Sequence, residues 1–188
     1  DFQFPGGTFE IFIDQLPGKR ILDLGCGFGR DVAKLRKLWY EAYGLDISEK
    51  LIDISEHDIR KYLTVWNMSD FMQIYENSKF DGIILAASLV HMDKDVWKSI
   101  LKKAYTSLQK SWVLFISIKI SETLSWAIIK ESISIPWKKK KYVYYAENEL
   151  DIFLEQVWFN IITTNINTNP NDSWKVFICK RPNSCHLS

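Results

Sequence analysis

One stretch constrains this chain more than any other, residues 21–31, which read ILDLGCGFGRD. Its first half, ILDL, is the apolar pattern of a buried parallel strand. Its second half carries glycine at alternate positions, at Gly25, Gly27 and Gly29. Glycine lets the backbone adopt left-handed dihedral angles and lets a ligand approach the main chain closely. The pattern therefore predicts a strand that turns sharply into a helix, with a ligand lying against the turn.

The spacing of these glycines separates two kinds of nucleotide ligand. The dinucleotide-binding motif is G-x-G-x-x-G or A, and its third small residue lets the helix pack closely on the strand. Counted from Gly25 and Gly27, that third position is Arg30, a bulky cation that argues against NAD or FAD. The segment instead fits Asp23-x-Gly25-x-Gly27-x-Gly29. A glycine-rich turn without a ligand is the structural alternative.

With this motif the chain resembles the class I S-adenosylmethionine-dependent methyltransferases, over residues 18–180. The resemblance implies one α/β domain over residues 1–180, followed by a polar C-terminal tail. It implies a doubly wound, mostly parallel seven-stranded sheet with an antiparallel last strand, in three α/β/α layers (a Rossmann-like fold). It also implies S-adenosylmethionine as cofactor. The acidic residue, here Asp23, works near the methionine end of that cofactor, and the loop from Gly25 to Gly29, with Cys26 inside it, passes under its methionine and ribose.

A carboxylate follows at the end of the next expected strand, residues 42–46. Asp46 lies 17 residues after Gly29, close to the roughly 20 at which an acid at a strand tip accepts hydrogen bonds from ribose hydroxyls. Dehydrogenases place an acid there too, so Asp46 indicates a ribose rather than one cofactor. The alternative role, capping the following helix, falls more naturally to Ser48. Ile47 is assigned to the cofactor site together with Asp46.

Residues 64–70, TVWNMSD, predict a third strand followed by a polar loop. The resemblance places Asp70 at the amino group of the adenine, with Met68 and Ser69 beside the ring. An Asp after a short strand is equally typical of a plain turn, so this assignment stays open.

Residues 80–92, FDGIILAASLVHM, predict a central parallel strand and its exit loop. Small stand-alone bacterial methyltransferases show a similar strand ending in Ser-Leu-x-His, which implies that Ala86 belongs to the cofactor site. Ser88 and His91 are expected at the carboxyl end of the sheet, where open α/β folds bind ligands. His91 is the candidate catalytic acid or base near the acceptor. A histidine that caps or packs under the next helix is the alternative.

The remaining pattern completes the expected sheet. A helix is predicted up to residue 108, with an apolar stripe at Val96, Ile100, Ala104 and Leu108. Further elements are expected as a fifth strand at 112–119, a helix at 150–157, and two last strands at 159–165 and 175–180. In the resembled family these last strands form an antiparallel hairpin beside strand five.

An aromatic-rich segment, residues 121–145, occupies the place where the resembled family usually carries a substrate-covering insertion. Its rings could line an acceptor pocket or simply pack in the core. They are Trp126, Trp137, Tyr142, Tyr144 and Tyr145.

Three tryptophans stand where the resembled family has turn-forming glycine: Trp39, Trp112 and Trp158. We expect all three to be exposed and to occupy left-handed caps or tight turns, at a cost of about 1 kcal/mol or more each. Together with a segment of only about twenty residues before the first strand, they motivate an alternative function. The chain could be a degenerate module that binds S-adenosylmethionine or a partner and transfers nothing.

Composition excludes several other classes. The net charge of +1, from 24 basic and 23 acidic side chains, gives no strong signal for nucleic acid or for an anionic membrane. No apolar run approaches the about 18 residues of a membrane-spanning helix, and no leader precedes Asp1, so a cytoplasmic protein is expected. Cys26, Cys179 and Cys185 show no spacing of a disulfide framework or metal site, and no metal is expected.

The resemblance thus implies transfer of a methyl group from S-adenosylmethionine by in-line displacement. The motif of DNA amino-methylases, Asp-or-Asn-Pro-Pro-aromatic, is replaced here by Ala86-Ala87-Ser88-Leu89, and no cysteine follows a proline as cytosine C5 methylases require. A small-molecule acceptor is therefore favoured, although its identity and the oligomeric state cannot be read from the residues.

Overall fold

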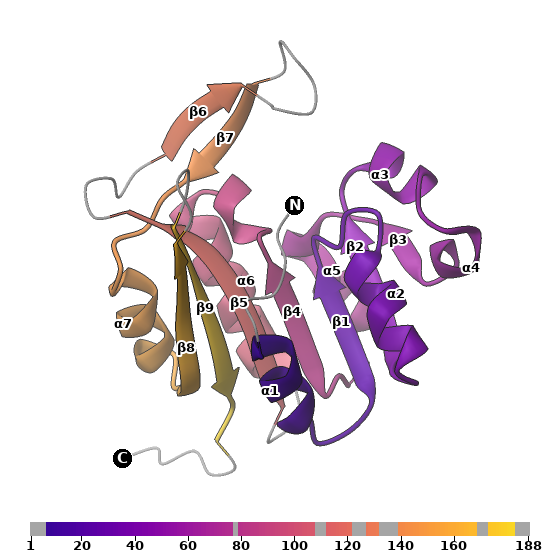
Figure 1. Ribbon diagram of the computed structural model, residues 1–188, viewed down its shortest axis with the longest axis horizontal. Coiled ribbons are helices and arrows are strands. Elements are labelled where there is room, and N and C mark those ends of the chain that lie inside the picture. Colours follow the sequence, from indigo (N-terminus) through magenta and orange to yellow (C-terminus); the bar gives the residue numbers. More distant parts are fainter. Residues whose placement is uncertain are drawn as a thin grey trace.

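A seven-stranded sheet lies between two layers of helices, as the ribbon diagram shows (Figure 1). The structure is a computed structural model that describes residues 7–76, 79–107, 112–121, 127–131, 139–168 and 173–182. Of the expected tail, 181–188, residues 183–188 with Cys185 lie outside the described residues, as do Trp126 and Trp137. No described helix is long and apolar enough to cross a membrane.

The strands of the main sheet follow the order β3-β2-β1-β4-β5-β9-β8. All neighbouring strands are parallel except β9, which is antiparallel to both β5 and β8. This arrangement confirms the predicted mostly parallel sheet with an antiparallel last strand. The strands are β1 (Arg20–Leu24), β2 (Glu41–Asp46), β3 (Leu63–Val65), β4 (Gly82–Ala86), β5 (Val113–Ile120), β8 (Asn160–Thr168) and β9 (Ser173–Lys180).

The helices divide between the two faces according to the buried clusters that they join. One face is covered by α1 (Thr8–Asp14), α2 (Arg30–Lys37), α3 (Glu49–Asp53) and α4 (His57–Arg60). The other is covered by α5 (Phe71–Tyr75), α6 (Lys94–Ser107) and α7 (Glu149–Gln156). In Figure 1, α1 and α2 lie in front of the sheet and α6 lies behind it. The predicted three layers are confirmed.

The central strands are apolar throughout because both of their faces are buried. In β5, Phe115 points into the front cluster, where its ring meets the edge of Phe12 at a centroid distance of 6.0 Å. Its neighbour Leu114 points into the rear cluster with Trp97 of α6. Each large side chain buried in this way contributes about 1.5–3 kcal/mol. The two cores together hold the ends of the strands in fixed positions.

The buried stripe of α6 differs from the predicted one by one position. Trp97, Ile100, Leu101 and Ala104 are fully buried, whereas Val96 is 39% exposed. The prediction of Val96 was wrong because the large indole of the next residue turns toward the sheet instead. Leu108 lies outside the described residues.

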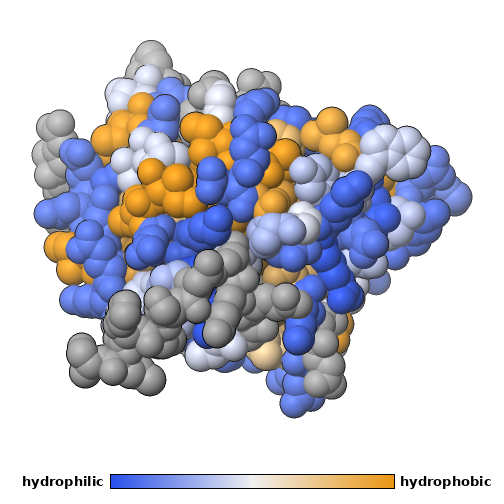
Figure 2. Space-filling model, turned by 90° about the horizontal axis from the view of Figure 1, so that it is seen from below, coloured by the Kyte–Doolittle hydropathy of each residue, from blue (hydrophilic) through white to orange (hydrophobic). Residues whose placement is uncertain are grey.

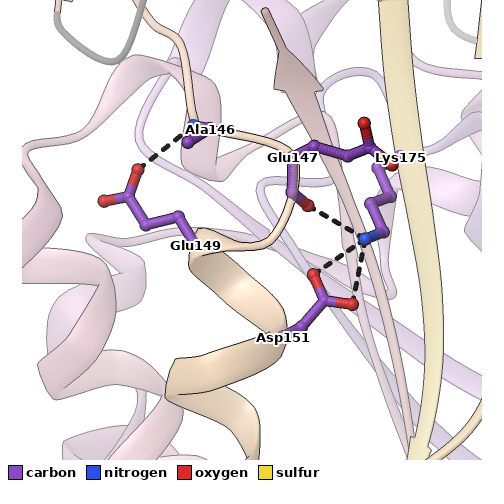
Figure 3. A network of polar contacts seen from close by, with 5 residues as sticks. All are labelled: Ala146, Glu147, Glu149, Asp151 and Lys175. Carbon is purple, nitrogen blue, oxygen red and sulfur yellow. Dashed lines mark hydrogen bonds and ion pairs between the residues drawn. The ribbon is translucent and has the colours of Figure 1, made fainter. Parts of the chain in front are cut away.

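Helix α7 is fastened to the sheet by a buried cation (Figure 3). Lys175 of β9 is 6% exposed, and its Nζ donates to both carboxylate oxygens of Asp151, at 2.9 and 2.8 Å, and to the carbonyl oxygen of Glu147 at 2.9 Å. Glu149 accepts from the N–H of Ala146 at 3.3 Å. This network fixes the end of the helix beside the antiparallel strands, so Lys175 has a structural role.

Two of the three predicted tryptophan turns are present. Trp39 follows α2 with φ 65° and is 83% exposed, and Trp158 follows α7 with φ 62° and is 64% exposed. Trp112 is a correction: its side chain is fully buried and meets Phe159 edge to face at 5.5 Å. The prediction was wrong there because the segment before β5 faces the rear core instead of solvent.

The aromatic-rich segment contains a two-stranded antiparallel hairpin of β6 (Ala127–Glu131) and β7 (Lys139–Val143). Figure 1 shows it standing beyond the carboxyl edge of the parallel strands. The chain then returns alongside β5, because the N–H of Tyr145 donates to the carbonyl oxygen of Lys119 at 3.1 Å. Tyr145 is fully buried against Trp97. Core packing is therefore the role of this ring.

Candidate active site

The predicted strand-to-helix turn is the loop between β1 and α2. All three of its glycines are left-handed, with φ 83° at Gly25, 57° at Gly27 and 80° at Gly29. Gly29 is the N-cap residue of α2, and its N–H donates to the carbonyl oxygen of Cys26 at 2.9 Å. L-residues with side chains rarely adopt such angles. The conformational reason for the glycine pattern is confirmed.

The surroundings of the glycines differ in a way that matters for a ligand. A Cβ on Gly25 would lie 2.5 Å from the Cβ of Ser88 and 2.7 Å from Cε of Met68. A Cβ on Gly29 would lie 2.7 Å from Leu63. A Cβ on Gly27 would meet nothing within 4 Å. Gly25 and Gly29 are thus small because protein packs on them, whereas Gly27 faces open space in which a ligand can lie.

The end of β2 holds this loop through the backbone and through one carboxylate. Leu45 accepts hydrogen bonds from the N–H groups of Gly25 (2.7 Å) and Cys26 (3.0 Å). Asp46 accepts from the N–H of Gly27 at 2.8 Å through Oδ2, and from that of Ser48 at 2.8 Å through Oδ1. A carboxylate offers about four acceptor positions, so Asp46 keeps capacity for the hydroxyls of a ligand.

The N-cap of α3 is Ser48, as expected. Its side chain accepts from the N–H of Leu51, at 3.4 Å. Asp46 is therefore not required as the cap of this helix. Ile47, between the two, is 72% exposed at the rim of the loop.

Asp23 is a carboxyl group buried beneath the loop. It is 2% exposed in β1. Burial raises its pKa well above the ordinary value, the negative charge of Asp31 raises it further, and the cation of Arg30 partly opposes both. Arg30 itself pairs with Asp31 at 3.0 Å. A buried acid in this state is stabilised as a carboxylate by any cation that binds next to it.

Cys26 packs as a compact side chain over β2. A Cβ on Gly44 would lie 2.6 Å from its Sγ, so Gly44 makes room for the thiol. Burial, and then the charges of Asp23 and Asp46, raise the pKa of Cys26 above its ordinary value. A thiol with a raised pKa is a poor nucleophile, which agrees with the packing role predicted for it.

The third wall is the short helix η1 (Met68–Asp70). Met68 is buried and reaches Gly25, as described above. Ser69 is held from both sides: its N–H donates to Oδ1 of Asn67 at 3.0 Å, and its carbonyl oxygen accepts from Nζ of Lys103 at 2.6 Å. Asp70 lies 4.0 Å from the same ammonium, with its side chain 45% exposed. No sequence pattern indicates that α6 anchors this segment through Lys103.

The exit of β4 contains a strained residue. Ala86 ends the strand half-buried, and Ala87 has φ 55°, which costs a residue with a side chain about 1–2 kcal/mol. The N–H of Ala87 donates to Oγ of Ser117, a fully buried residue of β5, at 2.8 Å. Ser88 follows, 7% exposed. Left-handed residues with side chains are concentrated at functional sites.

His91 lies farther out, in the short helix η2 (Leu89–His91). Its ring stands 5.0 Å, centroid to centroid, from that of Tyr142 in β7. His91 is an exposed residue, so it does not pack under the next helix, whereas its capping of that helix stays a prediction. On the same hairpin, Tyr142 faces Nζ of Lys119 at 4.6 Å. Lys119 is 6% exposed and also faces the rings of Tyr144 and Trp174, at 5.7 and 5.2 Å.

The structure brings most of the predicted residues to one edge of the sheet. Those that gather at the ends of β1 and β2, with η1 against them, are Asp23, Gly25, Cys26, Gly27, Asp46 and Met68. Ser69 and Asp70 are turned toward α6. Among the described residues no group of three His, Cys, Asp or Glu is placed to hold a metal ion.

Comparison with known proteins gives a similar family and a shared fold. Residues 21–111 match the protein family described as a methyltransferase domain. The fold matches an S-adenosylmethionine-dependent methyltransferase of Methanosarcina mazei with a TM-score of 0.79, at 18% identity, over 93% of this chain and 98% of that one. The chain is thus similar to a methyltransferase domain over residues 21–111, and it has the fold of S-adenosylmethionine-dependent methyltransferases. Members of this family take their methyl group from S-adenosylmethionine.

The methyltransferases that this chain resembles are named for varied compounds. Magnesium-protoporphyrin O-methyltransferase of Synechocystis is 26% identical over 141 residues, which are 73% of this chain and 60% of that protein. The chain therefore spans less than two thirds of that relative. A 1,6-didemethyltoxoflavin-N1-methyltransferase of Burkholderia thailandensis shares the fold with a TM-score of 0.70, at 19% identity over 92% of this chain and 76% of that one.

Proposed function

We propose that this methyltransferase domain transfers a methyl group from S-adenosylmethionine to a small-molecule acceptor. The observation that carries the proposal is the pairing of Gly27 with Asp46 at the ends of β1 and β2. The carboxylate is held by the loop N–H at 2.8 Å, and the space above the glycine is open. A ribose hydroxyl needs such an acceptor, and its sugar needs backbone without a side chain.

The other residues of the edge suit the rest of that cofactor. When bound, S-adenosylmethionine supplies a methyl group on a positively charged sulfur. Asp23, buried with a raised pKa, gains a counter-ion if the cationic methionine end lies near it. Cys26 and Met68 offer apolar contact beside the loop. The residues therefore hold and orient the cofactor, and alignment of the acceptor can supply most of the rate enhancement.

For the acceptor we propose the surface beyond β4, where η2 and β7 meet. The ring centroids of His91 and Tyr142 lie 5.0 Å apart there, and Nζ of Lys119 lies 4.6 Å from the centroid of the Tyr142 ring. The names of the relatives support a small molecule, since one acts on a porphyrin and another on a toxoflavin precursor. The net charge of +1 supports a small acceptor over nucleic acid.

Three cysteines without disulfide or metal spacing favour a reducing compartment such as the cytoplasm.

Binding and turnover test the proposal in sequence. Isothermal titration with S-adenosylmethionine and S-adenosylhomocysteine is expected to give binding that Asp46→Ala weakens by about 1–3 kcal/mol, the range for hydrogen bonds to a charged group. Formation of S-adenosylhomocysteine against a metabolite pool then measures transfer. Absence of binding would contradict the proposal. Binding without turnover on any acceptor would favour the degenerate binding module.

We propose His91 as the general base that removes a proton from the acceptor. His91→Asn is then expected to lower the turnover rate about 100-fold, the lower range of general base catalysis, with unchanged cofactor affinity. The wild-type rate should also fall as the imidazole becomes protonated in acid. Rates are measured per folded molecule from pH 5 to 9. Equal rates of wild type and variant across this range would exclude the base and leave alignment as the mechanism.

A further inference from the structure

Ser88 carries a hydroxyl that the protein itself does not use. The residue is 7% exposed, and its buried Oγ has no hydrogen-bond partner in the described part of the chain. It occupies the N-cap position of η2, where serine usually accepts a hydrogen bond from the helix, yet it makes no such bond. An unsatisfied buried hydroxyl costs about 1–3 kcal/mol. A ligand that forms a hydrogen bond with this hydroxyl would offset that cost.

The position of this hydroxyl points to the cofactor loop. Oγ lies 3.4 Å from the point that a Cβ on Gly25 would occupy, and the Cβ of Ser88 lies 2.5 Å from it. The N–H of Gly25 already donates to Leu45, so it leaves the hydroxyl without that partner. The serine therefore stands beside the first glycine of the loop, above the strand that carries Asp23.

The backbone holds Ser88 there at a cost. Ala87, immediately before it, is kept at φ 55° by the hydrogen bond from its N–H to Ser117. Ser117 is fully buried, and its strand β5 is paired with β4, so this clamp is rigid. Without the left-handed step at Ala87 the chain would leave β4 in another direction and carry the hydroxyl away from the loop.

We propose that the Ser88 hydroxyl binds the amino-acid end of the cofactor, the ammonium and carboxylate of its methionine part. This inference rests on the proposed function. The hydroxyl can donate to the carboxylate or accept from the ammonium, and either bond satisfies the buried Oγ on binding. Ser117 acts as a positioning residue through Ala87.

A truncated ligand tests the assignment. S-adenosylhomocysteine carries the amino-acid end, whereas 5′-methylthioadenosine keeps the adenosine and sulfur but lacks it. Ser88→Ala is expected to weaken S-adenosylhomocysteine about tenfold or more, as loss of a hydrogen bond to a charged group does. Binding of 5′-methylthioadenosine should change less than about twofold. Both dissociation constants are measured by isothermal titration on the whole chain.

The melting temperature without ligand is a second test. If Ser88 had a structural role, its replacement by alanine would lower this temperature. Removal of an unsatisfied hydroxyl should leave the ligand-free melting temperature of Ser88→Ala equal to or above that of wild type. Tyr145→Phe is the matched control, because its buried hydroxyl is likewise without a partner among the described residues, but its ring packs on Trp97 in the core. It should leave both dissociation constants unchanged.

The possible results separate the inference from the function. Unchanged affinity for S-adenosylhomocysteine in Ser88→Ala, an equal loss for both ligands, or a lower ligand-free melting temperature would each overturn the role of Ser88 while the proposed function stands. Failure of the wild type to bind either ligand would overturn both. If Ser88→Ala does not fold, Ser88→Cys keeps the volume with a weak donor and should show the same selective loss.

Discussion

The β1–α2 loop at the carboxyl edge and two helix ends at the amino edge both use left-handed backbone, but with opposite kinds of residue. At the carboxyl edge the turn is made by glycines, Gly25, Gly27 and Gly29. At the amino edge, Trp39 and Trp158 adopt φ 65° and 62°. The molecule seen from below in Figure 2, on the side of the amino ends of the parallel strands, shows apolar side chains gathered in a broad patch.

The turns at the amino edge keep the hydrogen bonds of a glycine cap. The N–H of Trp39 donates to the carbonyl oxygen of Arg36 at 3.0 Å, and the N–H of Tyr40 donates to the carbonyl oxygen of Leu35 at 3.1 Å. This is the paired pattern of the Schellman motif, and the same pair of bonds follows α7. A side chain at this position extends into solvent, so it costs only the left-handed strain of about 1–2 kcal/mol.

This difference explains why the β1–α2 loop requires glycine, whereas the turns at the amino edge accept tryptophan. At Gly25 a side chain would collide with Ser88 and Met68, and at Gly27 it would fill the proposed ligand space. At Trp39 the indole meets solvent. The same backbone conformation is therefore a steric requirement where a ligand or a neighbour lies close, and only an energetic cost where none does.

The largest effect is expected from the tryptophan that departs from this pattern. Trp112→Ala should lower the free energy of unfolding by about 3–5 kcal/mol, because it removes a fully buried indole. Trp39→Ala, the matched loss of an 83% exposed indole, should change it by less than about 1 kcal/mol. Denaturant unfolding measures both. Equal small losses would mean that Trp112 belongs with the turns after all.

Asp23, the buried acid of the carboxyl edge, is expected to strengthen binding of the cofactor and to lower the stability of the ligand-free protein. Asp23→Asn is expected to weaken S-adenosylmethionine by about 1.5–3 kcal/mol, as loss of a charged partner does. Burial raises the pKa of Asp23, so the folded protein favours the protonated carboxyl group. The free energy of unfolding therefore falls as the pH rises through this raised pKa and the group becomes charged. The ligand-free variant should therefore melt higher than wild type near neutral pH, with the difference shrinking in acid.

Thermal melts from pH 4 to 8 and titration calorimetry at neutral pH check both parts. A lower melting temperature for Asp23→Asn at neutral pH would show that the carboxylate stabilises the fold, contrary to the account of its burial.

Two glycines in the same conformation separate strain from ligand contact. Gly27 (φ 57°) and Gly7 (φ 81°) both face open space, with nothing within 4 Å of an added Cβ. Each substitution by alanine should cost about 1–2 kcal/mol of stability through left-handed strain. Only Gly27→Ala should weaken S-adenosylhomocysteine, by about tenfold or more. Calorimetry that finds equal affinity in both variants would remove Gly27 from the ligand surface.

The smallest effect should come from restoring glycine at the amino edge. Trp39→Gly relieves strain but adds chain entropy to the unfolded state, for a net gain of about 0.5–1 kcal/mol. This corresponds to a rise in melting temperature of about 1–4 °C. Trp158→Gly should gain less, because Trp158 also contacts the ring of Tyr105 at 6.3 Å. A fall in melting temperature at Trp39 would mean that its indole stabilises the fold.

The sequence predicted the central strands and the glycine loop because both depend on local patterns. Apolar runs mark β1, β4 and β5, and glycine spacing marks the turn that follows β1. The left-handed caps at Trp39 and Trp158 were predicted from the glycines that the resembled family carries there, and both follow the C-cap residue of a helix. These features involve residues close together in the chain, where propensity and periodicity act.

What the sequence could not show depends on distant contacts. Ser117 holds Ala87 from thirty residues away in the chain, and Lys103 of α6 reaches the loop at Ser69. Neither residue type nor spacing predicts such a partner. The burial of Trp112 and the rotation of α6 that buries Trp97 in place of Val96 likewise follow from tertiary packing. One residue corresponds to about 100° around a helix, so the buried stripe keeps Ile100 and Ala104 but includes Trp97 in place of Val96.

Hydrogen exchange with and without S-adenosylhomocysteine tests the contrast between the edges most directly. We predict that saturating ligand slows exchange in peptides spanning residues 24–29, 44–48 and 86–88, at the carboxyl edge. Peptides around Trp39 and Trp158, at the amino edge, should exchange at the same rate in both samples. Protection at the amino edge, or none at the glycine loop despite measured binding, would contradict the assignment of the carboxyl edge as the ligand site.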